Sequence, residues 1–219
     1  MEHTFWHNKW EINQVGFHLD YVHPLLKRNL ELFQVSSVLK KPEKIFIPLC
    51  GKTLDIGFLL SQGYDIVAIE LSDIAVKEVF NQLEIVPVIC SWLGGEVYQY
   101  ENLTIFVGDY FSLTQKDLGQ ISFVYDRAAL IALPEKMRLE YAQHMARITQ
   151  YAPQLLITLD YEQSIAGGPP FAVSSEEVEA LYGGTYPIQL LEEADIIEEE
   201  PRFKAKGLTS FYQCAYKLK

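Results

Sequence analysis

The sequence predicts an α/β fold in which helices cover both faces of a doubly wound, mostly parallel sheet. From about residue 41, short apolar runs alternate with stretches of helical periodicity, which is typical of βαβ units. Several of these runs are apolar throughout, as strands covered on both faces require. The 219 residues, 49% of them apolar, suit one large core. We therefore expect a single domain over residues 1–219.

Five strands are expected in the alternating region, at residues 44–48, 64–70, 103–107, 121–125 and 155–159. Helices are expected between them at 53–62, 73–83 and 134–149. Ser72 suits the N-terminal cap of the second helix, and Pro134 suits the first turn of the third. Residues 41–160 therefore form the predicted central core.

The two ends of the chain depart from this alternation. Residues 1–40 combine aromatic and polar side chains and include helical spacing from about Pro24, so they predict an N-terminal helical cap or lid. In residues 161–219, a Gly-Gly-Pro-Pro loop precedes a helix that opens at Ser174 and runs to about Tyr182. Strands at 188–199 and 208–217 are expected to pair as an antiparallel edge hairpin.

Charge and composition argue against several classes of protein. Lys and Arg number 18 and Asp and Glu 29, so the net charge of −11 repels nucleic acid, and we expect no such partner. The N-terminus lacks a basic and apolar leader, and no run approaches ~20 apolar residues. We expect a cytoplasmic, monomeric protein without membrane association.

The cysteines and histidines do not form a recognisable metal or disulfide pattern. Cys50, Cys90 and Cys214 are widely spaced and contain no CxxC pair. His3 and His7 share the helical spacing of a metal pair, but no third ligand follows them. We expect a reducing compartment and no metal site.

The most informative segment is IFIPLCGKT at 45–53, a strand that runs into a tight glycine turn and then a helix. Ligands of doubly wound sheets bind at the carboxyl ends of the strands, where a glycine allows close approach of the backbone. Glu70 ends the next strand nineteen residues beyond Gly51, near the spacing at which an acidic residue holds the ribose hydroxyls of an adenosine. Glu70 could also be an ordinary solvated strand end.

The glycine pattern limits which adenosine-containing ligands are expected. A Walker A loop needs glycine where Phe46 stands, and the GxGxxG dinucleotide fingerprint is absent. A nucleoside without phosphates, such as S-adenosylmethionine, fits better. Asp109 and Tyr110 follow the third strand, where they could bracket an adenine, and Asp126 and Arg127 follow the fourth, next to a reacting group.

Two assignments stay open on the residues alone. Arg127 could face a ligand or could pair structurally with Asp126 or Glu70. Trp6 and Trp10 lie four apart on one helical face and could be core anchors instead of ligand contacts.

Six segments together resemble the thiopurine S-methyltransferases: FWHNKWE at 5–11, PLCGKTLD at 48–55, ELS at 70–72, GDYF at 108–111, YDRAAL at 125–130 and GPPF at 168–171. The resemblance runs from about Phe5 to Tyr216. Its Pro-Leu-Cys-Gly-Lys turn is more specific than a generic glycine loop. Thr53 stands where many members have Ser, Tyr110 stands where bacterial members often have Phe, and residues 81–102 and the last hairpin match most loosely.

The resemblance implies a class I, Rossmann-like methyltransferase fold that binds S-adenosylmethionine and releases S-adenosylhomocysteine. It implies cofactor contacts from Trp6, Trp10, Leu49, Gly51, Glu70, Asp109, Tyr110 and Arg127, within the cofactor-binding core at 41–160. It also places substrate contacts on Phe17, Arg127 and Arg202, with residues 161–219 as substrate loop, helix and edge hairpin.

The resemblance further implies methyl transfer to small aromatic or heterocyclic thiols of the thiopurine type, and selenium or tellurium species as further acceptors. Arg127 and Arg202 would hold the acceptor or its anionic form, with Asp126 orienting Arg127. A non-catalytic S-adenosylmethionine-binding module and a Rossmann-like NAD oxidoreductase are the alternatives. The single glycine of the first turn argues against the oxidoreductase.

Overall fold

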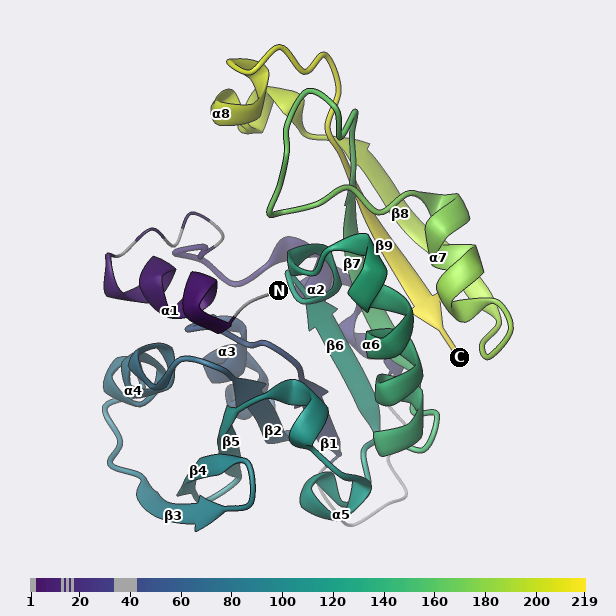
Figure 1. Ribbon diagram of the computed structural model, residues 1–219. Coiled ribbons are helices and arrows are strands. Elements are labelled where there is room, and N and C mark those ends of the chain that lie inside the picture. Colours follow the sequence, from purple (N-terminus) through teal and green to yellow (C-terminus); the bar gives the residue numbers. More distant parts are fainter. Residues whose placement is uncertain (1–2, 13, 15, 17, 34–42) are drawn as a thin grey trace.

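A computed structural model describes residues 3–12, 14, 16, 18–33 and 43–219. Within these residues, nine strands form one sheet in the order β3-β4-β5-β2-β1-β6-β7-β9-β8 (Figure 1). The strands are β1 (Lys44–Ile47), β2 (Asp65–Glu70), β3 (Val88–Trp92), β4 (Gly95–Tyr100), β5 (Leu103–Gly108), β6 (Phe123–Arg127), β7 (Gln154–Asp160), β8 (Ile188–Asp195) and β9 (Tyr212–Leu218). None of the described helices is long and apolar enough to cross a membrane.

The central strands β5, β2, β1, β6 and β7 are parallel, and antiparallel strands extend the sheet on both sides. Strand order reverses at β1, which lies between β2 and β6. The carboxyl ends of β1 and its neighbours therefore meet at the edge where doubly wound folds bind ligands.

Helices cover both faces of this sheet (Figure 1). The described α-helices are α1 (His3–Glu11), α2 (Pro24–Asn29), α3 (Asp55–Ser61), α4 (Asp73–Gln82), α5 (Gln115–Leu118), α6 (Glu135–Ile148), α7 (Ser175–Tyr182) and α8 (Pro201–Lys204). Short 3-10 turns are η1 (Leu30–Phe33), η2 (Tyr110–Ser112), η3 (Leu130–Ala132) and η4 (Ile197–Glu199).

Alternation along β1 divides the core into two layers. Ile45 and Ile47 pack with side chains of α2, α3 and α4, whereas Phe46 belongs to the cluster that includes α6 and α7. All three side chains are buried, because successive residues of a strand point to opposite faces and both faces are covered.

The predicted fold class is confirmed, including the C-terminal antiparallel pair β8 and β9. All five predicted central strands exist, with ends that differ by one or two residues. The strand expected at 121–125 is displaced to Phe123–Arg127, so Asp126 and Arg127 lie inside it. Ser72 caps α4 as expected, and Ser174 caps α7.

Three elements differ from the sequence expectation. The β3–β4 hairpin lies between the helix expected at 73–83 and the strand expected at 103–107, where the sequence analysis assigned no strand. Helix α3 begins at Asp55 instead of residue 53, because the glycine turn continues through Thr53. Strand β8 ends at Asp195 instead of 199, because η4 and α8 follow; Arg202 therefore lies on a short helix and not in a loop.

Candidate active site

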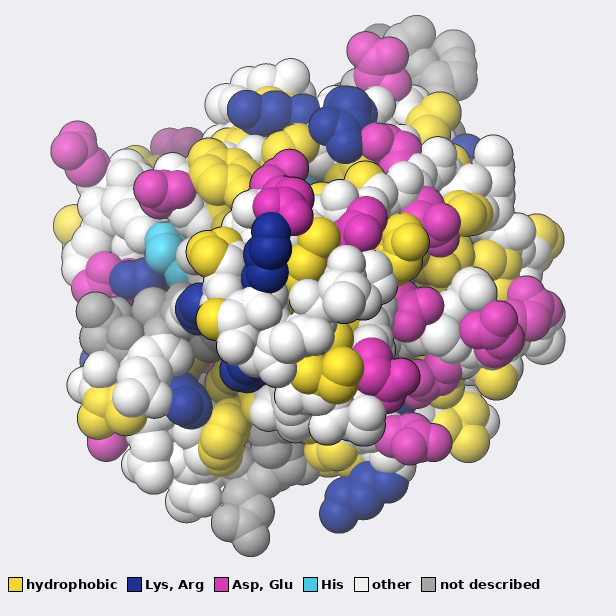
Figure 2. Space-filling model, turned by 90° about the horizontal axis from the view of Figure 1, so that it is seen from above, with side chains coloured by type: hydrophobic (Ala, Val, Ile, Leu, Met, Phe, Trp, Pro, Cys, Tyr) yellow, Lys and Arg dark blue, Asp and Glu magenta, His cyan; other side chains and the backbone are white. Residues whose placement is uncertain are grey.

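A cavity of about 760 Å³ lies at the carboxyl ends of the parallel strands. Its walls come from the ends of β1, β2, β5, β6 and β7, from α1 and α8, and from the loop at 168–170. Figure 2 looks onto this end of the molecule, where acidic side chains dominate the right of the view and basic and acidic side chains are mixed elsewhere.

The glycine turn after β1 is closed by the carboxylate of Glu70. The Gly51 amide donates to Glu70 Oε2 at 2.8 Å, and the Ser72 amide donates to Oε1 at 2.9 Å. Leu49 and Gly51 have φ values of 44° and 55°, in the left-handed region that favours glycine. Strain at Leu49, a non-glycine residue in the cavity wall, is the kind that clusters at ligand sites.

Glu70 is buried, so it is not the ordinary solvated strand end that the sequence left open. The residue is 7% exposed, and burial raises the pKa of its carboxyl, while the amides of Ser72 and Gly51 oppose that shift by donating to the charged form. Glu70 therefore has a structural task in shaping the turn and also reaches the cavity wall.

The end of β5 brings Asp109 and Tyr110 into the same wall. Asp109 caps the following turn, since its Oδ1 accepts from the Phe111 amide at 2.9 Å. Tyr110 is buried against Tyr141, with ring centroids 4.7 Å apart, and its hydroxyl donates to the Tyr141 carbonyl at 3.3 Å. Gly108 is required here, because a Cβ on it would collide with the Gly94 carbonyl oxygen.

Helix α1 contributes Trp6 and Trp10 to the cavity wall. Trp6 is half-buried and meets Phe5 edge to face at 5.2 Å, whereas Trp10 is buried. Trp10 is thus both buried and part of the cavity wall. Its two predicted roles, as a core anchor and as a ligand contact, are therefore compatible.

Asp126 and Arg127 point to opposite faces of β6. The Asp126 carboxylate is fully buried, where Oδ2 accepts from the Tyr141 hydroxyl at 2.7 Å and Oδ1 accepts from the Leu130 amide at 3.1 Å. Burial raises the pKa of Asp126 to about 6. Asp126 is not among the described residues that line the cavity, and its contacts do not support the expected role of orienting Arg127.

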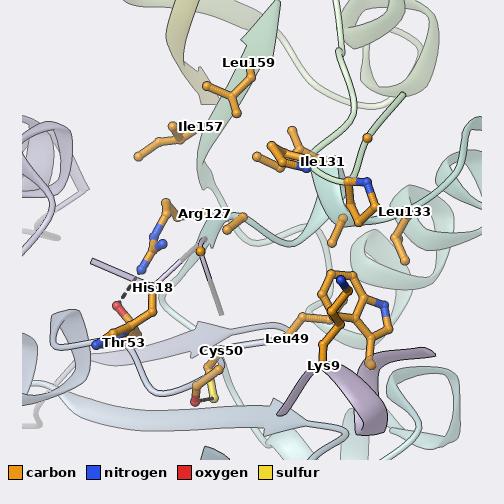
Figure 3. Close-up of a pocket in the computed structure, with 18 of the residues that line it drawn as sticks. Lys9, His18, Leu49, Cys50, Thr53, Arg127, Ile131, Leu133, Ile157 and Leu159 are labelled. Atoms are coloured by element: carbon orange, nitrogen blue, oxygen red, sulfur yellow. Dashed lines mark hydrogen bonds between the residues drawn. The ribbon is translucent and has the colours of Figure 1, made fainter. Parts of the chain in front are cut away.

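Arg127 lies in the cavity wall and binds residues that follow the glycine turn (Figure 3). Its Nη2 donates to Thr53 Oγ1 at 2.7 Å and lies 3.4 Å from Asp55 Oδ2. The carboxylate paired with Arg127 is therefore that of Asp55, neither that of Asp126 nor that of Glu70.

Arg202, expected on the substrate side, reaches the cavity from α8. Its exposed guanidinium donates from Nη2 to the Gly16 carbonyl at 3.1 Å. The acidic run at 198–200 is instead bound by Lys204, whose Nζ lies 2.6 Å from Glu198 Oε2. Phe17, the remaining residue of the expected substrate side, lies outside the described residues.

Sequence reasoning missed Thr53, Asp55, His18 and His23 as parts of this region. Thr53, His18 and His23 line the cavity, and Asp55 lies behind Arg127. Burial, followed by the positive charge of Arg127, lowers the pKa of His23 to about 4. The signal for Thr53 and Asp55 was present in PLCGKTLD at 48–55, although the partner of the acid could not be inferred from that segment.

Basic side chains outnumber acidic ones in the described part of the cavity wall. The Lys and Arg residues are Lys9, Lys52, Arg127, Arg202 and Lys206, and the acidic residues are Glu70, Asp109 and Glu200. This balance is opposite to the net charge of −11 of the whole chain. The cavity therefore favours a ligand or reacting group with negative charge more than the rest of the surface does.

The residues present fit an adenosine-containing sulfonium cofactor. A carboxylate stands at the end of β2, aromatic rings of α1 and Tyr110 line one side, and the turn at Gly51 exposes backbone to the cavity. The glycine turn has neither the phosphate-binding loop nor the dinucleotide fingerprint, which agrees with a ligand that lacks phosphates.

Solved structures support the same fold. A 1,6-didemethyltoxoflavin-N1-methyltransferase from Burkholderia thailandensis, solved with bound substrate and S-adenosylhomocysteine, is similar with a TM-score of 0.62. It is 11% identical and the match covers 99% of this chain and 86% of that one. An S-adenosylmethionine-dependent methyltransferase from Anabaena variabilis has a TM-score of 0.57, 13% identity, and coverage of 99% and 95%. At these identities the likeness shows the fold alone.

The sequence comparisons identify the family. A protein named thiopurine S-methyltransferase from Teredinibacter turnerae is 44% identical over 192 residues, covering 88% of this chain and 87% of its own. Another of that name from Shewanella piezotolerans is 42% identical, covering 100% of this chain and 98% of its own. The family model described as thiopurine S-methyltransferase matches residues 1–219. The chain therefore belongs to the thiopurine S-methyltransferase family and is an S-adenosylmethionine-dependent methyltransferase.

Proposed function

We propose that this enzyme transfers a methyl group to the sulfur atom of small aromatic or heterocyclic thiols of the thiopurine type, and that selenium or tellurium species are further acceptors. The observation that carries this proposal is the position of Arg127. Arg127 lies in the cavity wall beside Ile157, its partner on β7, with Leu159 farther along that strand and Ile131 across the same space (Figure 3). A cation beside apolar walls suits a flat ring that carries a thiolate.

The cofactor side of the proposed site is the part near α1 and the glycine turn. We propose that Glu70 accepts hydrogen bonds from the ribose, that Leu49 and Gly51 bring backbone close to the ligand, and that Asp109 and Tyr110 contact the adenine. Trp6 and Trp10 would cover the cofactor from α1, and Arg127 would lie between cofactor and acceptor. Leu49 and Lys9 face the same part of the cavity in Figure 3.

When bound, S-adenosylmethionine supplies an electrophilic methyl group on a sulfonium sulfur. The residues of this chain would then align the acceptor sulfur in line with that methyl and keep water out of the cavity. Arg127 and Arg202 favour the thiolate over the thiol, because a nearby positive charge lowers the pKa of an acid. Heteroaromatic thiols lose their proton readily, so the proposed reaction requires no dedicated base.

The histidines of the cavity do not compete with Arg127 as sources of positive charge. The pKa of His23 is lowered to about 4, and burial, Lys52 and Arg127 lower that of His18. Both imidazoles are therefore neutral at pH 7. Asp126 has no part in this proposal, since its carboxylate is bound on the other face of β6.

The test is incubation with methyl-labelled S-adenosylmethionine and a panel of thiols, selenols and tellurite, with oxygen and nitrogen analogues of the same rings as controls. The proposal expects label on sulfur acceptors and none on the analogues. Transfer only to nitrogen or oxygen would contradict it. Tight cofactor binding without transfer to any acceptor would indicate a non-catalytic binding module.

A further inference from the structure

Thr53, just before α3, and Asp55, its first residue, hold the guanidinium of Arg127. Arg127 Nη2 donates to Thr53 Oγ1 at 2.7 Å, the contact drawn as a dashed line in Figure 3, and lies 3.4 Å from Asp55 Oδ2. Thr53 is 6% exposed and Asp55 is fully buried. Hydrogen bonds that involve a charged group strengthen away from water, so these contacts are well placed to fix the side chain of Arg127.

Asp55 is itself held by His23, at the start of α2, and by Tyr125 of β6. The His23 amide donates to Oδ1 at 2.8 Å, and the Tyr125 hydroxyl donates to Oδ2 at 3.0 Å. The amide of Asp55 donates to Thr53 Oγ1 at 3.2 Å, so the two acceptors of Arg127 are also joined to each other. Burial and the neighbouring Asp55 charge raise the pKa of Tyr125, which keeps its hydroxyl protonated as a donor.

These contacts limit how Arg127 can move. A free arginine side chain at a cavity wall has many rotamers, and binding an acceptor would require it to lose that freedom. Two acceptors on one Nη atom, of which Asp55 is itself bound by His23 and Tyr125, restrict the position of the guanidinium before any methyl acceptor binds.

We propose that Thr53 and Asp55 are positioning residues that hold Arg127 in the orientation from which it meets the methyl acceptor. This inference rests on the proposed role of Arg127 toward the acceptor. Thr53 and Asp55 act through Arg127, so their loss lowers the rate of methyl transfer to a thiol and leaves the affinity for the cofactor nearly unchanged.

Thr53→Val and Thr53→Ser form the matched pair for this test. Valine keeps the shape of threonine without the oxygen that accepts from Arg127, and serine keeps the oxygen. We expect kcat/KM for a thiopurine to fall about tenfold in Thr53→Val, because small misplacements of a contact group cost up to ~10²-fold in rate. Thr53→Ser should restore most of that loss, and calorimetric titration should give S-adenosylhomocysteine affinities within about twofold for both.

Asp55→Asn tests the second acceptor and has a matched control at the start of another helix. Asp73 is likewise the first residue of its helix, α4, but it is exposed and pairs with Lys77. We expect Asp55→Asn to lower kcat/KM by ~10-fold or more and Asp73→Asn to leave it unchanged. If Asp55→Asn does not fold, the threonine pair decides the question.

The same variants on an Arg127→Gln background separate this inference from the proposed function. If Thr53 and Asp55 act through Arg127, Thr53→Val should cause little further loss in that background. A further loss equal to that seen with Arg127 present would overturn the inference, as would full activity of Thr53→Val in the wild-type background. Full thiol methylation by Arg127→Gln alone would instead overturn the proposed role of Arg127.

Discussion

Glu70 and Arg127 reach the cavity from the two strands that flank β1, and both charged groups are already bound by the protein. Glu70 accepts from two backbone amides, and Arg127 binds Thr53 and Asp55. Groups held in this way do not have to reorganise when a ligand binds, which is where much of the rate enhancement of enzymes originates.

Glu70→Gln should weaken binding and stability together. Glutamine offers one carbonyl oxygen to the two amides of Gly51 and Ser72, so its NH₂ group meets one of them without an acceptor. We expect S-adenosylhomocysteine affinity to fall about ten- to a hundredfold and the free energy of unfolding to fall by ~1–3 kcal/mol. Calorimetry and urea denaturation measure both. Glu135→Gln, exposed at the start of α6, is the control, and unchanged affinity in Glu70→Gln would remove Glu70 from the site.

Arg202→Ala should lower activity without affecting the cofactor. We expect kcat/KM for a thiopurine to fall about ten- to a hundredfold, ~1.4–2.7 kcal/mol, because Arg202 lines the cavity on the proposed acceptor side. Lys204→Ala is the control on the same helix, since Lys204 pairs with Glu198. Equal activity in the two variants would assign Arg202 to contact with Gly16 alone.

Asp126→Asn should change how stability depends on pH. The pKa of Asp126 is raised from 3.8 to about 6, so between these values the folded protein holds a proton that the unfolded chain releases. Unfolding is therefore favoured as pH rises through this window, by ~3 kcal/mol in total for this group. Asparagine removes the effect, and denaturation at pH 4 to 7 should show the variant gaining stability relative to wild type. Parallel pH profiles would contradict the assignment.

The residues of the site differ in how far the sequence could predict them. The spacing of Gly51 and Glu70 follows from the strand, turn and next strand, so the sequence could indicate both as candidates. The partner of Arg127 could not be, because Asp55 lies 72 residues away and meets it only when β6 packs beside the start of α3. Asp126 was expected to orient Arg127, whereas the two side chains point to opposite faces of β6 and Asp126 binds Tyr141 and Leu130.

At the scale of elements, the buried strands and most helices were predictable, whereas the edge formed by β3 and β4 was not. The β3–β4 hairpin has exposed apolar residues, including Val88 and Ile89, so it lacks the continuous or alternating pattern that identified the central strands. Gly94 and Gly95, at its turn, are the signal that could have indicated a hairpin. The β8–β9 pair was predictable, but its connection through η4 and α8 was not.

The buried Arg138 of α6 binds groups of the neighbouring segments. Arg138 donates from Nε to the Leu133 carbonyl at 2.9 Å and from Nη1 to the Ala172 carbonyl at 3.0 Å, and Nη1 also lies 2.6 Å from Glu177 Oε2. These contacts join α6, the loop that includes residues 168–170, and α7. The loop is part of the cavity wall.

Arg138→Met should destabilise this assembly. The variant removes a buried ionic partner and leaves two carbonyl acceptors without a donor, so we expect a loss of about 3 kcal/mol in the free energy of unfolding. Arg147→Met, exposed on the same helix, should change stability by less than ~0.5 kcal/mol. Urea denaturation of the two variants measures the difference, and equal small losses would show that the buried contacts contribute little.

At the scale of the whole molecule, an acidic chain encloses a cavity with more basic than acidic side chains in its described wall. Residues that are far apart in the sequence, from position 6 to position 202, lie together at the carboxyl ends of the parallel strands. Family membership fixes the methyltransferase activity and its cofactor. The identity of the methyl acceptor is a proposal that rests on the position of Arg127.

The most direct test is the site of the transferred methyl group on a thiopurine, which offers both sulfur and ring nitrogens. Wild type and Arg127→Gln would be compared with labelled S-adenosylmethionine, and the product would be located by mass spectrometry. We predict label on sulfur in wild type and a rate of sulfur methylation about ten- to a hundredfold lower in Arg127→Gln. Label on nitrogen, or an equal rate of sulfur methylation in Arg127→Gln, would contradict this prediction.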